Sequence, residues 1–284
     1  GALGSIIIWS ESKKGDNRNA LVMKRFGSES QQNVTYNLFN NTGASWNPNG
    51  DAIIYSAQTG RGSDILWQGF TPLRFKSKSV YFDKGKGSSA SWGVNGKLYL
   101  AKYMGDKNTD IFEYSLAQSA SGPQLGKGIN LTSHRAIETE AVLSPDGSKL
   151  AYISDRTGSP QVYLMDMKTK KSKRLTQKGE YNTSPAWSPD SSMIAYTSVT
   201  SGKSSIYRVE ADDPLGVANQ VSPKGLHAES PVWSSDGSMV AFQAKKAQDW
   251  KIYYVLSSGS TAQRLTNSVV GVNETVPSWN TGLN

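Results

Sequence analysis

The feature that most constrains the fold is a motif that recurs along the chain at nearly equal intervals. Each copy joins a short segment ending in a large apolar anchor to a polar turn and an alternating apolar segment, as in SPAWSPDSSMIAYTS. The anchors are Trp46, Trp92, Leu143, Trp187, Trp233 and Trp279. Successive anchors lie 46, 51, 44, 46 and 46 residues apart. Periods of about 40–50 residues indicate a propeller or a solenoid.

Within each copy the pattern is that of a β-meander. In the copy that begins at Ser184, SPAW reads as a short strand and SPDS as a turn, because proline presets φ and aspartate bonds the backbone two residues on. MIAYTS reads as a second strand, SIYRVEA as a third and NQVSPKG as a fourth. Period-two alternation between turn signals predicts all-β structure. No long amphipathic helical pattern occurs, which excludes a solenoid of helix pairs.

The two ends of the chain predict how the repeats are arranged. The chain begins with SIIIWSES (5–12), which reads as a second strand, followed by a third strand in NALVMKRF (19–26) and a fourth in NVTYNLF (33–39). It ends with VPSWN, which reads as a first strand. We therefore predict a six-bladed β-propeller of four-stranded antiparallel blades, in which the C-terminal strand joins the three N-terminal strands. Such closure removes the open edges that promote aggregation.

We expect a single domain over residues 1–284. The predicted blades span about 43–88, 89–138, 139–181, 182–226 and 227–273, and the shared blade combines 274–284 with 1–42. In this arrangement the anchor tryptophans pack between neighbouring blades rather than stack on a ligand.

The chain is basic, with a formal net charge of +8 and a pI near 9.4. The positive charges are scattered, and the densest cluster, KTKKSKR (168–174), falls where a hairpin connection is expected. We therefore interpret it as a solvated loop and predict no nucleic-acid partner. The sequence contains no cysteine, so disulfide and thiol chemistry are excluded. No apolar run approaches the ~18–20 residues needed to cross a bilayer, so no membrane insertion is expected.

The repeat resembles that of TolB-type β-propellers. The resemblance rests on LSPDGSKLAYISDRTGSPQVYLMDM (143–167), SPAWSPDSSMIAYTSVTSGKSSIYRV (184–209) and SPVWSSDGSMVAF (230–242). It extends over the whole chain and is strongest from about Ile129 to Thr266. The blades from Gly43 to Leu116 are looser, with NPNG and GVNG in place of SPDG.

The resemblance implies a non-enzymatic, periplasmic, monomeric protein of the Tol–Pal system, which supports outer-membrane integrity and cell division. Its expected partner is the peptidoglycan-associated lipoprotein Pal. Family members also carry a smaller N-terminal α/β domain that contacts TolA. Because this sequence does not contain that domain, TolA is expected as a partner only where the domain exists. No cofactor and no catalytic residue are predicted.

Residues just before the innermost strands are predicted to ring one mouth of the central channel. His227 lies six residues before its anchor, and Thr139, Thr183 and Thr275 lie four before theirs, which matches the positions of Pal-binding residues in TolB-like proteins. The predicted partner-binding residues are Asn41, Glu138, Thr139, Glu140, Asn182, Thr183, His227, Glu229, Glu274 and Thr275. The alternative interpretation is that these polar residues only cap backbone groups at loop ends.

Two further functions stay open at this stage. His134 and His227, which the repeat count places one sector apart near Glu138, Glu140 and Glu229, are a candidate metal site, as in a lyase-like or carbohydrate-binding propeller that uses its central channel. However, no HExxH or Asp-rich calcium loop accompanies them. The other alternative is a scaffold in a surface complex that binds through basic side loops such as Lys168–Arg174. No GxSxG motif supports serine hydrolysis.

Overall fold

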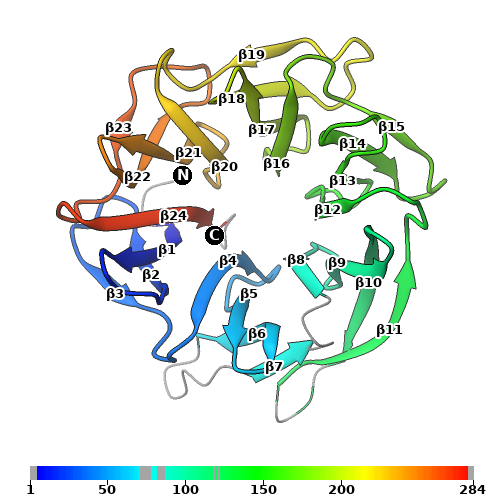
Figure 1. The fold of residues 1–284 in the computed structure, drawn as a ribbon, viewed down its shortest axis with the longest axis horizontal. Coiled ribbons are helices and arrows are strands. Elements are labelled where there is room, and N and C mark those ends of the chain that lie inside the picture. The colour runs from blue at the N-terminus through cyan, green and yellow to red at the C-terminus, as the bar shows by residue number, and fades with distance from the viewer. Residues whose placement is uncertain (1–4, 71–77, 82–86, 118, 120–121, 281–284) are drawn as a thin grey trace.

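The computed structural model describes residues 5–70, 78–81, 87–117, 119 and 122–280, which form six four-stranded antiparallel sheets. The sheets stand as blades around a central axis (Figure 1). The predicted six-bladed β-propeller is therefore confirmed. The part of the chain that is described contains no helix with the length and apolar character needed to span a bilayer.

Each blade runs outward from the axis in four strands. The innermost strands are β4 (Asn40–Trp46), β8 (Gly87–Trp92), β12 (Glu138–Leu143), β16 (Tyr181–Trp187), β20 (His227–Trp233) and β24 (Val272–Trp279). The second strands are β1 (Ile6–Lys13), β5 (Ala52–Thr59), β9 (Leu98–Gly105), β13 (Lys149–Ser154), β17 (Met193–Thr200) and β21 (Met239–Lys246). The third strands are β2 (Ala20–Arg25), β6 (Gly62–Gly69), β10 (Asn108–Ala117), β14 (Gln161–Asp166), β18 (Lys203–Glu210) and β22 (Asp249–Leu256). The outer strands are β3 (Gln31–Asn33), β7 (Lys78–Tyr81), β11 (Gln124–Asn130), β15 (Ser172–Arg174), β19 (Ala218–Gln220) and β23 (Gln263–Arg264).

The ring is closed by strands from opposite ends of the chain. β24 pairs with β1 in register Ile7 with Trp279 and Lys13 with Val272. The indole N–H of Trp279 also donates to the hydroxyl of Ser5 at 2.5 Å. The predicted shared blade is thus present, although its extreme ends, residues 1–4 and 281–284, lie outside the described residues.

The anchor tryptophans lie between blades, as expected. Trp187 packs in one cluster with side chains from the preceding blade, including Ile153 and Leu164. Its indole N–H donates to the backbone oxygen of Val142 at 2.9 Å, and Trp233 donates to Ala186 in the same way at 3.0 Å. Trp187 and Trp233 therefore each join two sheets both by apolar burial and by a hydrogen bond across the seam.

The outer strands end earlier than the sequence predicts. The expected fourth strands at 33–39 and 219–225 are observed as β3, which ends at Asn33, and β19, which ends at Gln220. After each of these strands, an apolar residue followed by Ser or Thr forms hydrogen bonds with the third strand of the same blade. The N–H of Val221 donates to the carbonyl of Ile206, and the N–H of Ile206 donates to the hydroxyl of Ser222. The same pairing anchors the loops that lead to the next innermost strands at Leu131–Thr132 and Leu175–Thr176.

Candidate functional site

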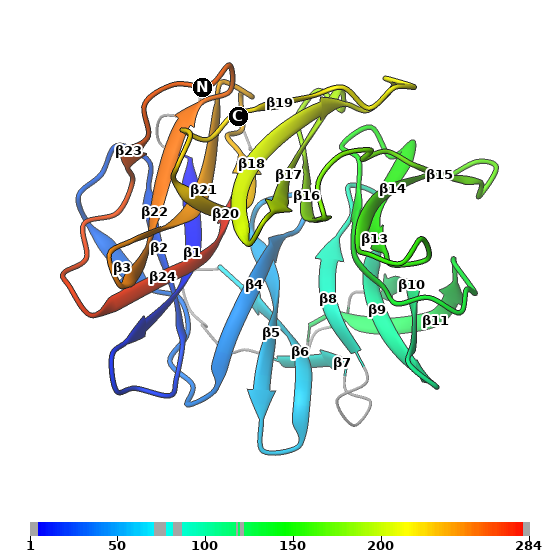
Figure 2. The ribbon, with the colours of Figure 1, turned by 45° about the horizontal axis from the view of Figure 1, so that its top comes forward.

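One face of the disc, termed here the mouth face, is defined by where the innermost strands begin. Strands alternate in direction within a blade, so the hairpins between second and third strands open on this face, as do the loops that lead into each innermost strand. Figure 2 shows the β1–β2 and β5–β6 hairpins projecting from the same side. The predicted partner-binding residues lie here, but within the innermost strands rather than before them, because these strands begin earlier than expected.

Every innermost strand contains a bulge three residues before its anchor. At this position the backbone adopts a left-handed conformation, with φ between 50° and 68°, and the register with the second strand shifts. The residues are Gly43, Ser89, Glu140, Ser184, Ser230 and Val276. A left-handed β-branched residue such as Val276 is rare and costly. All six bulge residues line the central cavity, so the bulges shape the channel.

The bulges and the residues after them enclose a central cavity of about 330 Å³. Serine, alanine and proline line most of it. Glu140 supplies the only carboxylate among the described residues that line this cavity. Its Oε2 accepts the backbone N–H of Ser184 at 2.7 Å, and burial raises the pKa of the Glu140 carboxyl above its usual value. The cavity is therefore lined by small side chains and contains a single titratable group among the described residues.

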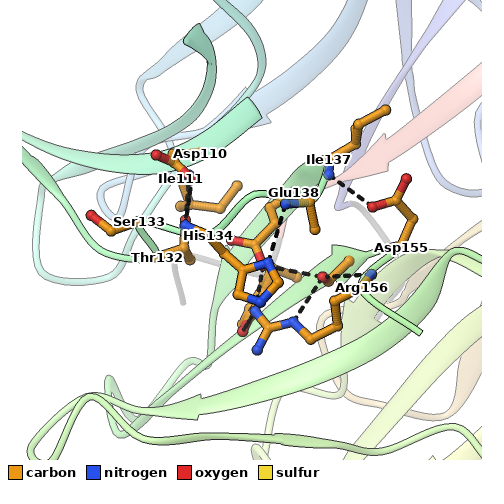
Figure 3. Close-up of polar contacts among 12 residues, drawn as sticks. Asp110, Ile111, Thr132, Ser133, His134, Ile137, Glu138, Asp155 and Arg156 are labelled. Atoms are coloured by element: carbon orange, nitrogen blue, oxygen red, sulfur yellow. Dashed lines mark hydrogen bonds and ion pairs between the residues drawn. The ribbon is translucent and has the colours of Figure 1, made fainter. Parts of the chain in front are cut away.

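Four of the ten predicted residues are fully buried and hold neighbouring chain segments in place. They are Asn41, Glu138, Asn182 and Glu274. The carboxylate of Glu138 pairs with Arg156 and accepts the hydroxyl of Ser154, as Figure 3 shows around this blade. The other three also form hydrogen bonds within the protein: Asn41 with Phe39, Asn182 with Gln161, and Glu274 with Thr266. Their side chains are inaccessible here, so we restrict the proposed contact surface to the exposed residues.

Glu274 illustrates the balance of forces at these buried positions. Its Oε1 accepts the hydroxyl of Thr266 at 2.7 Å and lies 3.2 Å from Nη2 of Arg264. Burial raises the pKa of the Glu274 carboxyl, and the hydrogen bonds and the arginine oppose that rise. The result is a structural pair that fixes the entry into β24.

The six other predicted residues are partly exposed: Thr139, Glu140, Thr183, His227, Glu229 and Thr275. Nδ1 of His227 lies 2.7 Å from the hydroxyl of Ser204, and its Nε2 lies 3.6 Å from Oε1 of Glu229. The His227 ring packs against Trp250 at 5.2 Å between ring centroids. Because Ser204 is buried, this arrangement exposes an imidazole and a carboxylate rather than a hydroxyl nucleophile.

The two histidines of the metal-site alternative do not converge. His134 precedes β12 and His227 begins β20, and the β16 sheet lies between these blades, so the interval is larger than the single sector expected. Nδ1 of His134 accepts the backbone N–H of Ala136 within a turn (Figure 3). Among the described residues, no three His, Cys, Asp or Glu side chains form a group that could hold a metal ion.

Sequence reasoning missed a set of exposed apolar side chains on the mouth face. Ile137 and Tyr181 stand six residues before their anchors, in the position that His227 occupies in its own blade, and are 44% and 42% exposed. Val270, in the loop before β24, is 92% exposed. Further members are Tyr36, Leu38, Tyr103, Met104 and Val269. The repeat alignment contained the signal for Ile137 and Tyr181, because both precede predicted polar positions by one or two residues.

Fold and site together define a six-bladed β-propeller whose ring is closed by the first and last strands and whose mouth face carries exposed apolar side chains around a central cavity. The sequence model of the TolB β-propeller domain matches residues 123–282, more than half of the chain. The chain belongs to the TolB β-propeller domain family.

A curated relative matches part of the chain, and solved structures share its fold. A TolB homolog from Chlorobium luteolum is 46% identical over 39 residues, which cover 14% of this chain and only 9% of that protein. The structure of TolB from Acinetobacter baumannii superposes with a TM-score of 0.84 at 23% identity, over 98% of this chain and 67% of that one. The structure of putative TolB from Agrobacterium tumefaciens superposes with a TM-score of 0.69 at 17% identity, over 92% of this chain and 88% of that one. The structure of an oligogalacturonate lyase in complex with manganese shares the fold, with a TM-score of 0.60 at 15% identity, over 93% of this chain and 74% of that one.

Proposed function

We propose that this propeller acts by binding a protein at its mouth face, as a periplasmic component of a Tol–Pal-like envelope system. The proposed partner is a Pal-like lipoprotein. Family membership supports this assignment, and the exposed apolar residues around the mouth carry it for this chain. Exposed large apolar groups that gather on one face and surround a recess are typical of protein-binding sites.

The proposed contact has an apolar part and a polar part. Ile137 and Tyr181 come from adjacent blades and provide the apolar anchors, since aromatic and aliphatic groups near the centre of an interface contribute most of its affinity. Thr139, Thr183 and Thr275 stand four residues before their anchors, two positions further into the innermost strand than Ile137 and Tyr181, and are partly exposed. Their hydroxyls are suited to hydrogen bonds that set the register of an inserted loop.

The test is calorimetric titration of the propeller with the purified soluble domain of a Pal-like lipoprotein. We expect binding by the wild type and a loss of about tenfold or more for Tyr181→Ala, because an anchor side chain is removed. Leu256→Ala is the matched control: it removes a side chain that is 53% exposed at the end of β22, on the opposite face. A folded wild type that does not bind at up to about 100 µM contradicts the proposal.

A further inference from the structure

The mouth face also carries most of the unpaired positive charge of the described chain. Its hairpins and inter-blade loops contain nine exposed cations that form no ion pair with a described carboxylate. They are Lys13, Lys14, Lys107, Arg135, Lys178, Lys203, Lys224, Lys245 and Lys246. We call this set the basic crown. Its members come from the loops of all but one of the blades, so the charge surrounds the mouth instead of forming a patch to one side.

Among the described residues, the exposed carboxylates of the same face are fewer than the cations of the crown: Asp16, Asp106 and Glu180. Asp155 accepts the backbone N–H of Ile137 at 2.8 Å, Glu180 accepts that of Ser201 at 3.0 Å, and Asp249 accepts that of Gly271 at 2.8 Å. Asp16 is paired with Arg18. These backbone hydrogen bonds fix the positions of the carboxylates but do not cancel their charge, while the lysines of the crown project into solvent. Cations therefore outnumber carboxylates among the exposed described side chains of this face, which favours the approach of an acidic ligand.

The opposite face differs in charge. Its turns carry carboxylates such as Asp146, Asp190 and Asp213, interspersed with the lysines of the β14–β15 hairpin and with Lys149, which pairs with Asp212. Among the described residues, the excess of exposed cations over exposed carboxylates therefore lies on the mouth face, which also carries most of the exposed large apolar side chains. A sequence count of +8 does not reveal this asymmetry.

We propose that the polypeptide that docks on the mouth face is acidic, with carboxylates that lie over the basic crown while its apolar residues meet Ile137 and Tyr181. This inference rests on the proposed protein-binding function and specifies the chemistry of the partner. The recess at the centre favours a protruding protein segment over a flat lipid surface, because the apolar and hydroxyl groups surround a hollow that only a narrow element can enter. Charge complementarity of this kind accelerates association and selects partners.

The experiment compares two triple variants with the same change in net charge. Lys203→Glu/Lys245→Glu/Lys246→Glu reverses charge in the crown, and Lys168→Glu/Lys171→Glu/Lys173→Glu reverses it in the hairpin of the opposite face. Association of the soluble Pal-like domain is followed by stopped-flow from about 50 mM to about 500 mM salt. We expect the crown variant to lose about tenfold or more in association rate at low salt, and the control to lose less than about twofold.

A second probe tests for an acidic partner independently of whether the Pal-like domain binds. A labelled acidic peptide of about twelve residues, rich in Glu and Leu, is titrated against the same proteins, alongside a peptide with Gln in place of Glu. Binding of the acidic peptide alone, lost in the crown variant and kept in the control, supports an acidic partner even if the Pal-like domain does not bind. Equal losses in both variants, no loss in either, or binding to phosphatidylglycerol vesicles in place of the peptide overturns the inference. Circular dichroism verifies that each variant is folded.

Discussion

The side chain of Glu140 in β12 accepts the backbone N–H of Ser184 in β16, so one innermost strand holds the next at its bulge. The equivalent N–H groups of Ser230 and Val276 donate to Thr197 and Gln243 of their preceding blades. In these three blades the donor is always the backbone N–H of the bulge residue, whereas the acceptor side chain is Glu, Thr or Gln. Glu140 is the one ionisable acceptor of these three, and this makes the blade seam at β12–β16 sensitive to pH.

The first prediction concerns Glu140→Gln. Burial raises the pKa of the folded-state carboxyl above its ordinary value of 4.5, so the folded protein binds more protons between those two values and loses stability as pH rises through that interval. Gln keeps an acceptor for Ser184 N–H without the charge. We expect the variant to be more stable than the wild type at neutral pH, with the difference vanishing below the ordinary pKa. Urea unfolding between about pH 4 and pH 8 measures this. A constant difference across that range would contradict it.

The second prediction concerns the left-handed position in β4. A Cβ added at Gly43 meets no atom within 4 Å, so Gly43→Ala changes only the backbone energy at φ +68°. We expect a loss of about 1 kcal/mol in the free energy of unfolding. Gly60→Ala is the control, because Gly60 also has open space around its Cβ but lacks a positive φ, and its effect should stay within about 0.5 kcal/mol. Equal effects at both positions would show that the bulge imposes no conformational cost.

The third prediction compares two anchors. The indole N–H of Trp233 donates to Ala186 across the seam, whereas the buried indole N–H of Trp46 has no hydrogen-bond partner. Both Trp→Phe changes remove similar apolar surface, but only Trp233→Phe leaves a carbonyl without its donor. We therefore expect Trp233→Phe to cost about 1 kcal/mol more than Trp46→Phe in chemical denaturation. A smaller cost at Trp233 would mean that the hydrogen bond across the seam does not stabilise the ring.

The fourth prediction concerns the buried pair at the closing strand. Arg264→Met leaves the fully buried Glu274 without its cation, which we expect to destabilise the protein by about 2 kcal/mol at neutral pH. Loss of the arginine raises the pKa of Glu274 further, so the penalty should shrink as the pH falls and the carboxyl becomes protonated. Thermal unfolding of the variant and of Arg264→Met/Glu274→Gln tests this, since the second change should recover most of the loss. Failure of Glu274→Gln to rescue would assign the effect to lost packing of the arginine.

The sequence was sufficient for the fold because its strongest signals are local and repeated. The spacing of Trp187 and Trp233, the Ser-Pro-Asp turns and the incomplete repeats at the two ends together required a closed ring. Strand ends were predicted less well. The expected strand over 33–39 was too long because Val34 and Thr35 bond Leu21 in the third strand, a tertiary interaction that period-two alternation does not register.

The candidate site was predicted in position but not in detail. Alternation along a strand places side chains on opposite faces, so Thr183 is partly exposed while its neighbour Asn182 is buried. Repeat counting located both at the mouth but did not determine which one faces solvent. The charge asymmetry depends on hairpins such as Lys246–Asp249, which are far apart in sequence and gather only when the ring closes.

The junction of β24 with β1 also determines how the molecule can be attached to something else. Ser5 touches Trp279, and Asn280 N–H donates to the carbonyl of Ile6 at 2.9 Å, so the described chain starts and stops at one point on the face away from the mouth. A tag or tether fused to either end would therefore leave the mouth unobstructed. For the same reason, joining the two ends and reopening the chain at an exposed turn should give a permuted protein with the same ring.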